Sequence, residues 1–151
     1  MRKQPGVANS PTGILTVLSV SPIEEDHRCL QDIIGHSNWS FLKADSFPPA
    51  LALLRRHEIS VVLCERDLGP RTWIDILENT THQTHPPCLI VTSRLADEGL
   101  WAEALNLGAW DVLAKPFDRS EVLHSVAQAR VHWHRQIHMP AMSLKLMTAA
   151  G

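Results

Sequence analysis

The chain has 151 residues, enough for one domain with a single hydrophobic core. Apolar residues make up 44% and charged residues 20%, as in an ordinary globular protein. Fourteen basic and sixteen acidic side chains give a net charge of −2, so composition gives no reason to expect nucleic acid or an anionic membrane as a partner. No run approaches the roughly 18 apolar residues of a membrane helix, and no apolar segment follows the basic start. We therefore expect a cytoplasmic protein whose three cysteines are reduced.

Runs of apolar, largely β-branched residues predict five buried strands. In chain order these are 14–20, 39–44, 61–64, 88–91 and 111–114. Helical spacing of apolar residues after each strand predicts five helices. These are 22–34, 48–57, 71–79, 96–107 and a long last helix that Asp118 caps and that runs to Pro140. Strands that alternate with helices in this way require a parallel, doubly wound α/β sheet with right-handed crossovers.

The two ends of the chain differ from this alternating pattern. Residues 1–13 are rich in Pro, Gly, Asn and Ser, which predicts a mobile leader. The α/β domain is predicted at 14–130, and 131–151 are predicted to extend the last helix and to end in a tail. Because so few residues follow Arg130, we expect no DNA-binding or catalytic output domain, and a module that acts on its own.

Residues near the predicted strand ends resemble the receiver domain of bacterial response regulators, over roughly 14–130. Val-Thr-Ser at 91–93 ends the fourth strand, and Leu-Gly-Ala-Trp-Asp at 107–111 leads into the fifth. Lys-Pro-Phe at 115–117 then follows at the family's spacing, and Glu-Arg-Asp-Leu at 65–68 fits the end of its third strand. The resemblance implies a flavodoxin-like sheet of order 2-1-3-4-5 and a role in two-component signalling through protein partners.

The family's phosphorylation pocket is incomplete in this sequence. In the family, two acidic residues after the first strand hold a magnesium ion, but the matching residues here are Ser21 and Pro22, which are poor ligands for such an ion. The family's phosphate-accepting aspartate aligns with Glu65. Thr92 and Lys115 match the family's other two pocket residues. The resemblance therefore implies a degenerate receiver.

Charge counting predicts that the pocket binds no metal. Glu65 and Lys115 would pair one to one, and a neutral pair needs no magnesium, without which phosphoryl transfer loses its main charge stabilisation. The nearest other carboxylates are Glu24, Glu25 and Asp26, which we expect to be solvated charges on the first turn of a helix. We therefore expect no metal, no cofactor and no catalytic residue.

Two roles for Glu65 are open. It can hold Lys115 in a static pocket, or it can imitate a phosphorylated aspartate. The family's switching aromatic residue aligns with Val112, and the missing ring favours the static pocket. Two other functions also stay open: a receiver phosphorylated on Glu65 or Asp67 with a relocated magnesium ligand, and a flavodoxin-like small-molecule binder. The sequence has no Gly-rich phosphate-binding loop, which counts against a nucleotide or flavin phosphate.

Tryptophans gather on the elements that form the output face of receivers. Trp101, Trp110 and Trp133, with Ile137, are candidates for a protein interface, although Trp101 and Trp133 fit a core position equally well. Apolar residues continue into the tail at Met142, Leu144, Leu146 and Met147. Unused apolar surface favours a partner site, so we expect a homodimer through the last two helices.

Two further motifs have a simpler structural interpretation. Cys64 is next to Glu65, but adjacent strand residues point to opposite faces and no histidine is placed to activate the thiol. His134 and His138 are four residues apart on the last helix, a spacing that can bind a metal. Their neighbours are basic, so we expect a solvated helix end.

Overall fold

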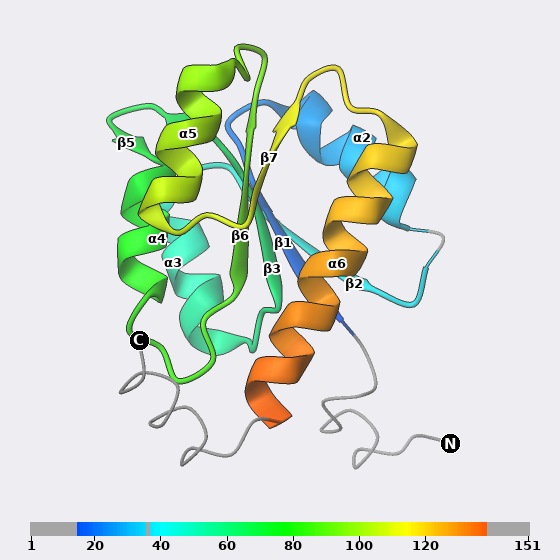
Figure 1. Ribbon diagram of the computed structural model, residues 1–151, viewed down its shortest axis with the longest axis vertical. Helices are drawn as coiled ribbons and strands as arrows, with labels where there is room; N and C mark the ends of the chain where they lie inside the picture. Colours follow the sequence, from blue (N-terminus) through cyan, green and yellow to red (C-terminus); the bar gives the residue numbers. More distant parts are fainter. Residues whose placement is uncertain (1–14, 36, 139–151) are drawn as a thin grey trace.

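In a computed structural model of the chain, residues 15–35 and 37–138 are described. Their five-stranded parallel sheet contains β1 (Thr16–Val20), β2 (Ser40–Ala44), β3 (Val61–Glu65), β6 (Cys88–Ser93) and β7 (Asp111–Ala114). The order across the sheet is β2-β1-β3-β6-β7, which is 2-1-3-4-5 when these strands are numbered along the chain (Figure 1). The predicted fold class is confirmed. The predicted leader at 1–13 and residues 139–151 of the predicted extension lie outside the described residues.

Five helices cover the two faces of this sheet. The first face packs against α2 (Glu24–Ile34) and α6 (Arg119–His138), and the second against α3 (Phe47–Arg56), α4 (Trp73–Thr80) and α5 (Glu98–Leu107) (Figure 1). On β3, Val61 and Leu63 belong to the core under α2 and α6, whereas Val62 and Cys64 belong to the core on the other face. Because strand side chains alternate, Glu65 shares the first face with Val61 and Leu63.

Side-chain caps determine where the later helices begin. Thr72 and Asp75 form a capping box, in which Ile74 N donates to Thr72 Oγ1 (3.2 Å) and Thr72 N donates to Asp75 Oδ2 (2.9 Å). This box starts α4 at Trp73, two residues after the predicted start. Asp118 Oδ1 accepts from Glu121 N (3.0 Å), which confirms the predicted cap of α6.

A short hairpin between β3 and α4 is absent from the sequence-based prediction. Its strands are β4 (Asp67–Leu68) and β5 (Arg71–Thr72), which pair antiparallel. Gly69 and Pro70 form the two-residue loop, and Gly69 has a φ of 86°, which favours glycine at the first loop position. The Gly-Pro pair therefore turns the chain within the hairpin.

The last helix is continuous across the predicted domain boundary at Arg130, because α6 extends from Arg119 to His138. Within 15–35 and 37–138, no helix combines the length and apolar character needed to cross a membrane.

Candidate functional site

Three charged side chains meet at the carboxyl edge of the sheet. Glu65 is the last residue of β3, Lys115 follows β7, and Asp26 lies in the first turn of α2. Lys115 Nζ donates to Asp26 Oδ2 at 2.6 Å and also forms an ion pair with Glu65 Oε1. The Lys115, Asp26 and Glu65 side chains are only 5%, 9% and 11% exposed. We call these three residues the charged cluster.

The position of Asp26 corrects the prediction that all three acidic residues at the start of this helix are solvated. Glu24 and Glu25 do lie at the surface, where they pair with Lys43 and Arg28, and the Lys43 ammonium lowers the pKa of Glu24. Asp26 instead points inward, because it is four and seven residues before Leu30 and Ile33, which are buried on the same helix face. That spacing is a sequence signal which could have identified Asp26.

Ser21 holds Asp26 in place. Its hydroxyl donates to Asp26 Oδ2 (2.7 Å) and accepts from Ile23 N (3.1 Å), at the residue that precedes α2. Pro22, the other residue at the family's acidic-pair positions, is exposed. Ser21 is therefore a support for the carboxylate that α2 supplies.

His27 extends this polar network below the charged cluster and was not identified from the sequence. It is buried, and its Nε2 lies 2.8 Å from the Ser21 carbonyl oxygen. Because a carbonyl only accepts, Nε2 donates, and in the neutral ring Nδ1 accepts from the Ser19 hydroxyl at 2.8 Å. His27 thus joins the end of β1 to the start of α2 and fixes the turn that carries Ser21.

The charged cluster is not the neutral pair that the sequence predicted. Two carboxylates face one ammonium, which leaves one negative charge in excess when each group is in its usual ionised form. The predicted neighbours Glu65 and Lys115 are paired, but Asp26 shares the same ammonium. Among the described residues, no group of three or more His, Cys, Asp and Glu side chains is arranged to hold a metal ion.

The other residues aligned with the family's pocket lie in different positions relative to Glu65. Thr92 is buried on β6 and is the register partner of Glu65, and its carbonyl accepts from Arg66 N at 2.9 Å. Asp67 is exposed, but its backbone N–H donates to Glu65 Oε2 at 3.4 Å. Val112 is buried in the core on the opposite face of the sheet. Asp67 therefore contacts Glu65 through its backbone N–H, while the residue is exposed at the surface.

The two cysteines on central strands lie in environments that disfavour the thiolate. Cys64 lies in the core under α3 and α4, on the face opposite to Glu65. Burial raises the pKa of Cys64, and burial raises the pKa of Cys88 to about 12. Cys29 on α2 is partly exposed, and burial is also the main cause of its raised pKa. Cys64 is therefore a core residue and not a nucleophile.

Thiol labelling should distinguish these cysteines. At pH 8 in the folded protein, a thiol reagent should label Cys29 first, and Cys64 and Cys88 should react only as fast as the protein opens. All three should react at once in denaturant. Labelling of Cys64 in the folded state at the rate of Cys29, read by mass spectrometry, would contradict this prediction.

The raised pKa values of the buried thiols also predict a loss of stability at high pH. Unfolded thiols lose their protons from about pH 8.5, whereas the buried Cys88 thiol keeps its proton up to about pH 12. The free energy of unfolding should therefore fall as the pH rises from about 8.5 to about 12.

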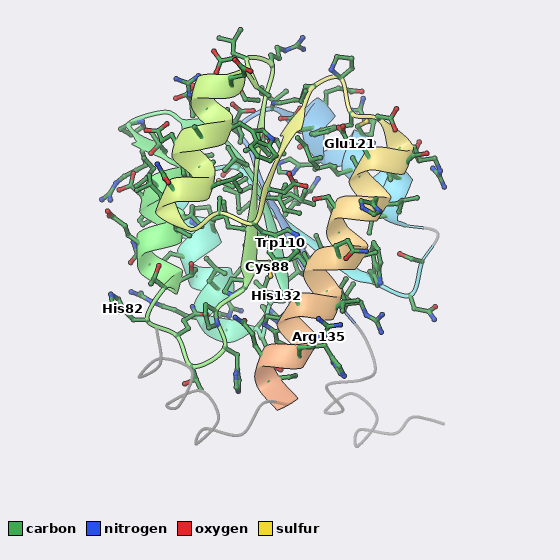
Figure 2. The ribbon with its side chains drawn as sticks, in the orientation of Figure 1. His82, Cys88, Trp110, Glu121, His132 and Arg135 are labelled. Carbon is green, nitrogen blue, oxygen red and sulfur yellow. The ribbon has the colours of Figure 1, made fainter. Side chains whose placement is uncertain are left out.

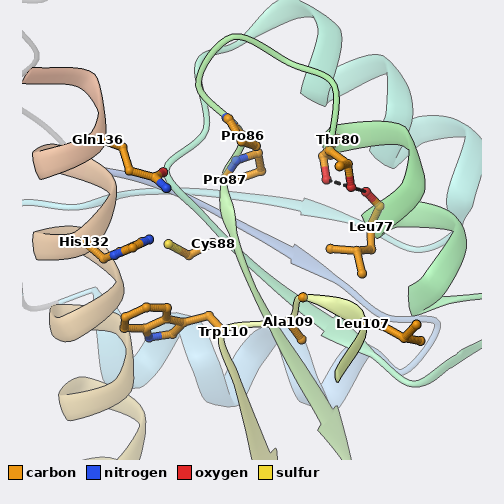
Figure 3. A pocket seen from close by; sticks show the side chains of 12 residues that line it. Leu77, Thr80, Pro86, Pro87, Cys88, Leu107, Ala109, Trp110, His132 and Gln136 are labelled. Carbon is orange, nitrogen blue, oxygen red and sulfur yellow. Dashed lines mark hydrogen bonds between the residues drawn. The ribbon is translucent and has the colours of Figure 1, made fainter. Parts of the chain in front are cut away.

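The four interface candidates have different environments. Trp133 is only 5% exposed and packs in the core under α6, so of the two positions that the sequence left open for it the structure favours the core. Trp110 is partly buried and stacks on His132 with ring centroids 4.7 Å apart. Both residues are labelled beside α6 in Figure 2, and Figure 3 shows their side chains from close by. Ile137 is partly buried against the same core as Trp133. Trp101, at 47% exposure, is the candidate with a free surface.

Of the two histidines four residues apart on α6, the structure describes the side chain of one. His134 is partly buried, and the side chain of His138 lies outside the described residues, as do the tail residues Met142, Leu144, Leu146 and Met147.

Comparisons with known proteins agree on one family. The sequence model of the response regulator receiver domain matches residues 23–127. No curated protein matches the sequence. Among solved structures, the signal receiver domain of an HD domain-containing protein from Pseudomonas fluorescens is 25% identical with a TM-score of 0.76, covering 83% of this chain and 93% of that one. The receiver domain of a protein assigned as a Luxo repressor from Vibrio parahaemolyticus has the same TM-score at 16% identity, covering 83% and 98%. Chemotaxis response regulator CheY4 of Vibrio cholerae is 15% identical with a TM-score of 0.70, covering 77% and 98%.

Proposed function

Since the chain belongs to the response regulator receiver domain family, we propose that it is an atypical receiver that acts through protein contacts without being phosphorylated. Receivers are signalling modules that work through protein partners. The proposal here is that this one has a permanent internal ion pair network in place of the phosphorylation chemistry. Its action as a stand-alone module and its cytoplasmic location stay predictions.

The charged cluster is the observation that supports this function. The Lys115 ammonium lies between Asp26 and Glu65, so a magnesium ion would have to displace a buried cation from both carboxylates. Glu65 Oε1 is fully buried against Lys115, which leaves this oxygen inaccessible to a phosphoryl donor. Ser21, at an acidic-pair position of the family, has no carboxylate of its own and donates its hydroxyl proton to Asp26. Phosphoryl transfer needs a metal and an in-line acceptor, and this arrangement favours neither.

Magnesium and phosphoryl donors should have no effect on the protein. We expect millimolar magnesium, alone or with acetyl phosphate or beryllofluoride, to leave the melting temperature unchanged, because a ligand that does not bind the folded state adds no stability. A matched control carries Ser21→Asp, Pro22→Asp and Glu65→Asp, which restores the family's carboxylates. This control should gain a magnesium-dependent rise in melting temperature. A saturable rise in the unchanged protein, or acid-labile phosphate on it, would refute the proposal.

One observation favours a second function, the receiver phosphorylated with a relocated magnesium ligand. Asp26 brings a second carboxylate from α2 to Glu65, as such a relocation requires. In that function magnesium would take the place of Lys115 between the two carboxylates. The same titration separates the two proposals, because only the second requires a magnesium response that Asp26→Asn abolishes.

We place the partner interface on α5, and we expect a homodimer there. Large apolar side chains on and before this helix are exposed without packing against the core. They are Leu95, Trp101, Leu105 and Leu107. Trp101 also borders a shallow hollow with Ala96, Asp97, Glu98 and Ala102. An exposed tryptophan beside a hollow is typical of an interface anchor, and Trp133 no longer supports an interface through α6.

A further inference from the structure

A cleft lies at the opposite end of the sheet from the charged cluster. It has a volume of about 240 Å³ and is bounded by the last turns of α6, the end of α4 and the segment that enters β7. In Figure 3, His132 reaches from α6 toward the cleft, and Pro86 and Pro87 lie across from Trp110. Because Cys88 begins β6 and also lines the cleft, the cleft is at the amino-terminal edge of the sheet.

Three polar side chains in the walls have already given their hydrogens to the protein. The Thr80 and Thr81 hydroxyls donate to the Leu77 carbonyl oxygen, at 3.0 and 2.7 Å. The Cys88 thiol donates to the Ala129 carbonyl oxygen at 3.5 Å. Each of these groups can then only accept a further hydrogen bond. The walls therefore favour a ligand that brings its own N–H donors.

Two helix carboxyl ends add a negative potential to the cleft. α4 ends at Thr80 and α5 ends at Leu107, and both residues line the cleft. The carboxyl end of a helix carries roughly half an elementary negative charge. Neither helix has a basic residue in its last turn to balance this charge. The cleft therefore disfavours carboxylates and phosphates and favours groups with positive charge.

The lining offers no side-chain charge that could form an ion pair with a cation. Among the described residues that line the cleft, none is Asp, Glu, Lys or Arg. Burial raises the pKa of Cys88 to about 12, so its thiol keeps its proton at neutral pH. A compact ammonium is strongly hydrated and needs a carboxylate to replace its water, whereas a planar, delocalised cation is hydrated more weakly. The cleft therefore suits a delocalised cation better than a compact one.

Trp110 gives the cleft a flat aromatic wall. Its ring stacks on His132 with centroids 4.7 Å apart, which holds the indole in one orientation. Tryptophan is the aromatic side chain that attracts cations most strongly. Drug-sized ligands occupy pockets of about 300–1,000 Å³, and this cleft is smaller, so it fits a single substituted ring.

We propose that this cleft binds a small planar aromatic cation with N–H donors, in the class of aromatic amidines and protonated heteroaromatic amines. The hydroxyl oxygens of Thr80 and Thr81 accept its N–H groups, and Trp110 packs on its ring. The carboxyl ends of α4 and α5 stabilise its charge. The site lies apart from the charged cluster and borders the proposed interface on α5 at Leu107.

Three probes of one shape test the proposal on the full-length chain. Benzamidine is a planar cation with N–H donors, benzamide is its neutral counterpart and benzoate is its anionic one. Each is titrated at pH 8, where an ordinary histidine is neutral, and is followed through the backbone amide NMR signals. Benzamidine should shift the signals of Thr80, Gly108 and Gln136 saturably and leave those of Asp26 and Glu65 unmoved. It should bind at least about tenfold more tightly than benzoate, with benzamide between them.

Charge changes at the edge of the cleft give a matched comparison. Gln136 is an exposed lining residue, so Gln136→Lys should keep the fold and weaken benzamidine binding by about threefold or more, while Gln136→Glu should strengthen it by a similar factor. Gln128→Lys makes the same change at an exposed residue of α6 outside the lining and should leave the affinity unchanged. Benzoate binding as tight as that of benzamidine, shifts centred on Asp26 and Glu65, or equal effects of the two lysine variants would overturn the proposal. So would the absence of saturable shifts with all three probes.

Discussion

Replacing Lys115 by methionine should lower the free energy of unfolding by about 3–5 kcal/mol, the usual cost of removing one partner from a buried ion pair. The reason is that Lys115 is the cation between Asp26 and Glu65, and without it two buried carboxylates face each other. Urea denaturation at neutral pH, with an unchanged m-value, measures this loss.

The two acidic partners should each cost less than the lysine. Glu65→Gln leaves Lys115 paired with Asp26, and Asp26→Asn leaves it paired with Glu65, so each change should cost about 1–3 kcal/mol. An amide oxygen can still accept from the ammonium in either variant.

The structure also determines which combination of changes restores stability. A pair model predicts that Glu65→Leu with Lys115→Met recovers most of the loss, but this double variant leaves Asp26 buried without its cation. Recovery should need Asp26→Leu as a third change, because buried ion networks can be replaced by apolar groups at little cost only when every member is removed. Full recovery in the double variant would show that Asp26 is not coupled to Lys115.

A double-mutant cycle of Glu65→Leu and Lys115→Met, which compares the two single variants with the double variant, also decides the role of Glu65. A coupling energy between Glu65 and Lys115 supports the static pocket. If their effects simply add, Glu65 is free to imitate a phosphorylated aspartate. Glu65→Ala would then change partner binding more than it changes stability.

Replacing Trp133 by alanine should destabilise the protein by about 3–5 kcal/mol, because it empties a large core position under α6. Trp133 lies in the same core cluster as Val126 and Ala129, and its Nε1 donates to the His85 carbonyl oxygen at 3.5 Å. The alanine variant therefore loses both the apolar packing and this hydrogen bond. Thermal or urea unfolding measures the effect, and Trp133→Phe should cost less since it keeps most of the apolar volume.

Trp101→Ala is the matched comparison, since the same change at an exposed site should alter monomer stability by less than about 0.5 kcal/mol. In light scattering, this variant should shift the homodimer toward monomer, while Ile23→Lys, an exposed change at the start of α2, should not. A monomer at high concentration without any substitution would contradict the homodimer. Equal destabilisation by Trp101→Ala and Trp133→Ala would contradict both assignments.

Local sequence patterns were sufficient to predict the sheet and the pairing of Glu65 with Lys115. Apolar runs and helical spacing depend on neighbouring residues, and parallel strands bring their carboxyl ends to one edge. Glu65 ends β3 and Lys115 follows β7, so their meeting follows from strand order alone. The cap at Asp118 is equally local, because it bonds to a backbone N–H three residues later.

Only the tertiary structure decided which further residues join them. Asp26 reaches Lys115 across 89 positions of sequence, because the turn held by Ser21 and His27 sets the rotation of α2 and so points Asp26 inward. Helical spacing before Leu30 and Ile33 separates Asp26 from Glu24 and Glu25, but it does not say which distant charge Asp26 meets. Trp133 and Trp101 likewise both lie on predicted helices, and their burial differs because α6 lies across the sheet while the Trp101 side of α5 faces outward. A periodic pattern defines the face of a helix, whereas the packing of distant elements decides what that face meets.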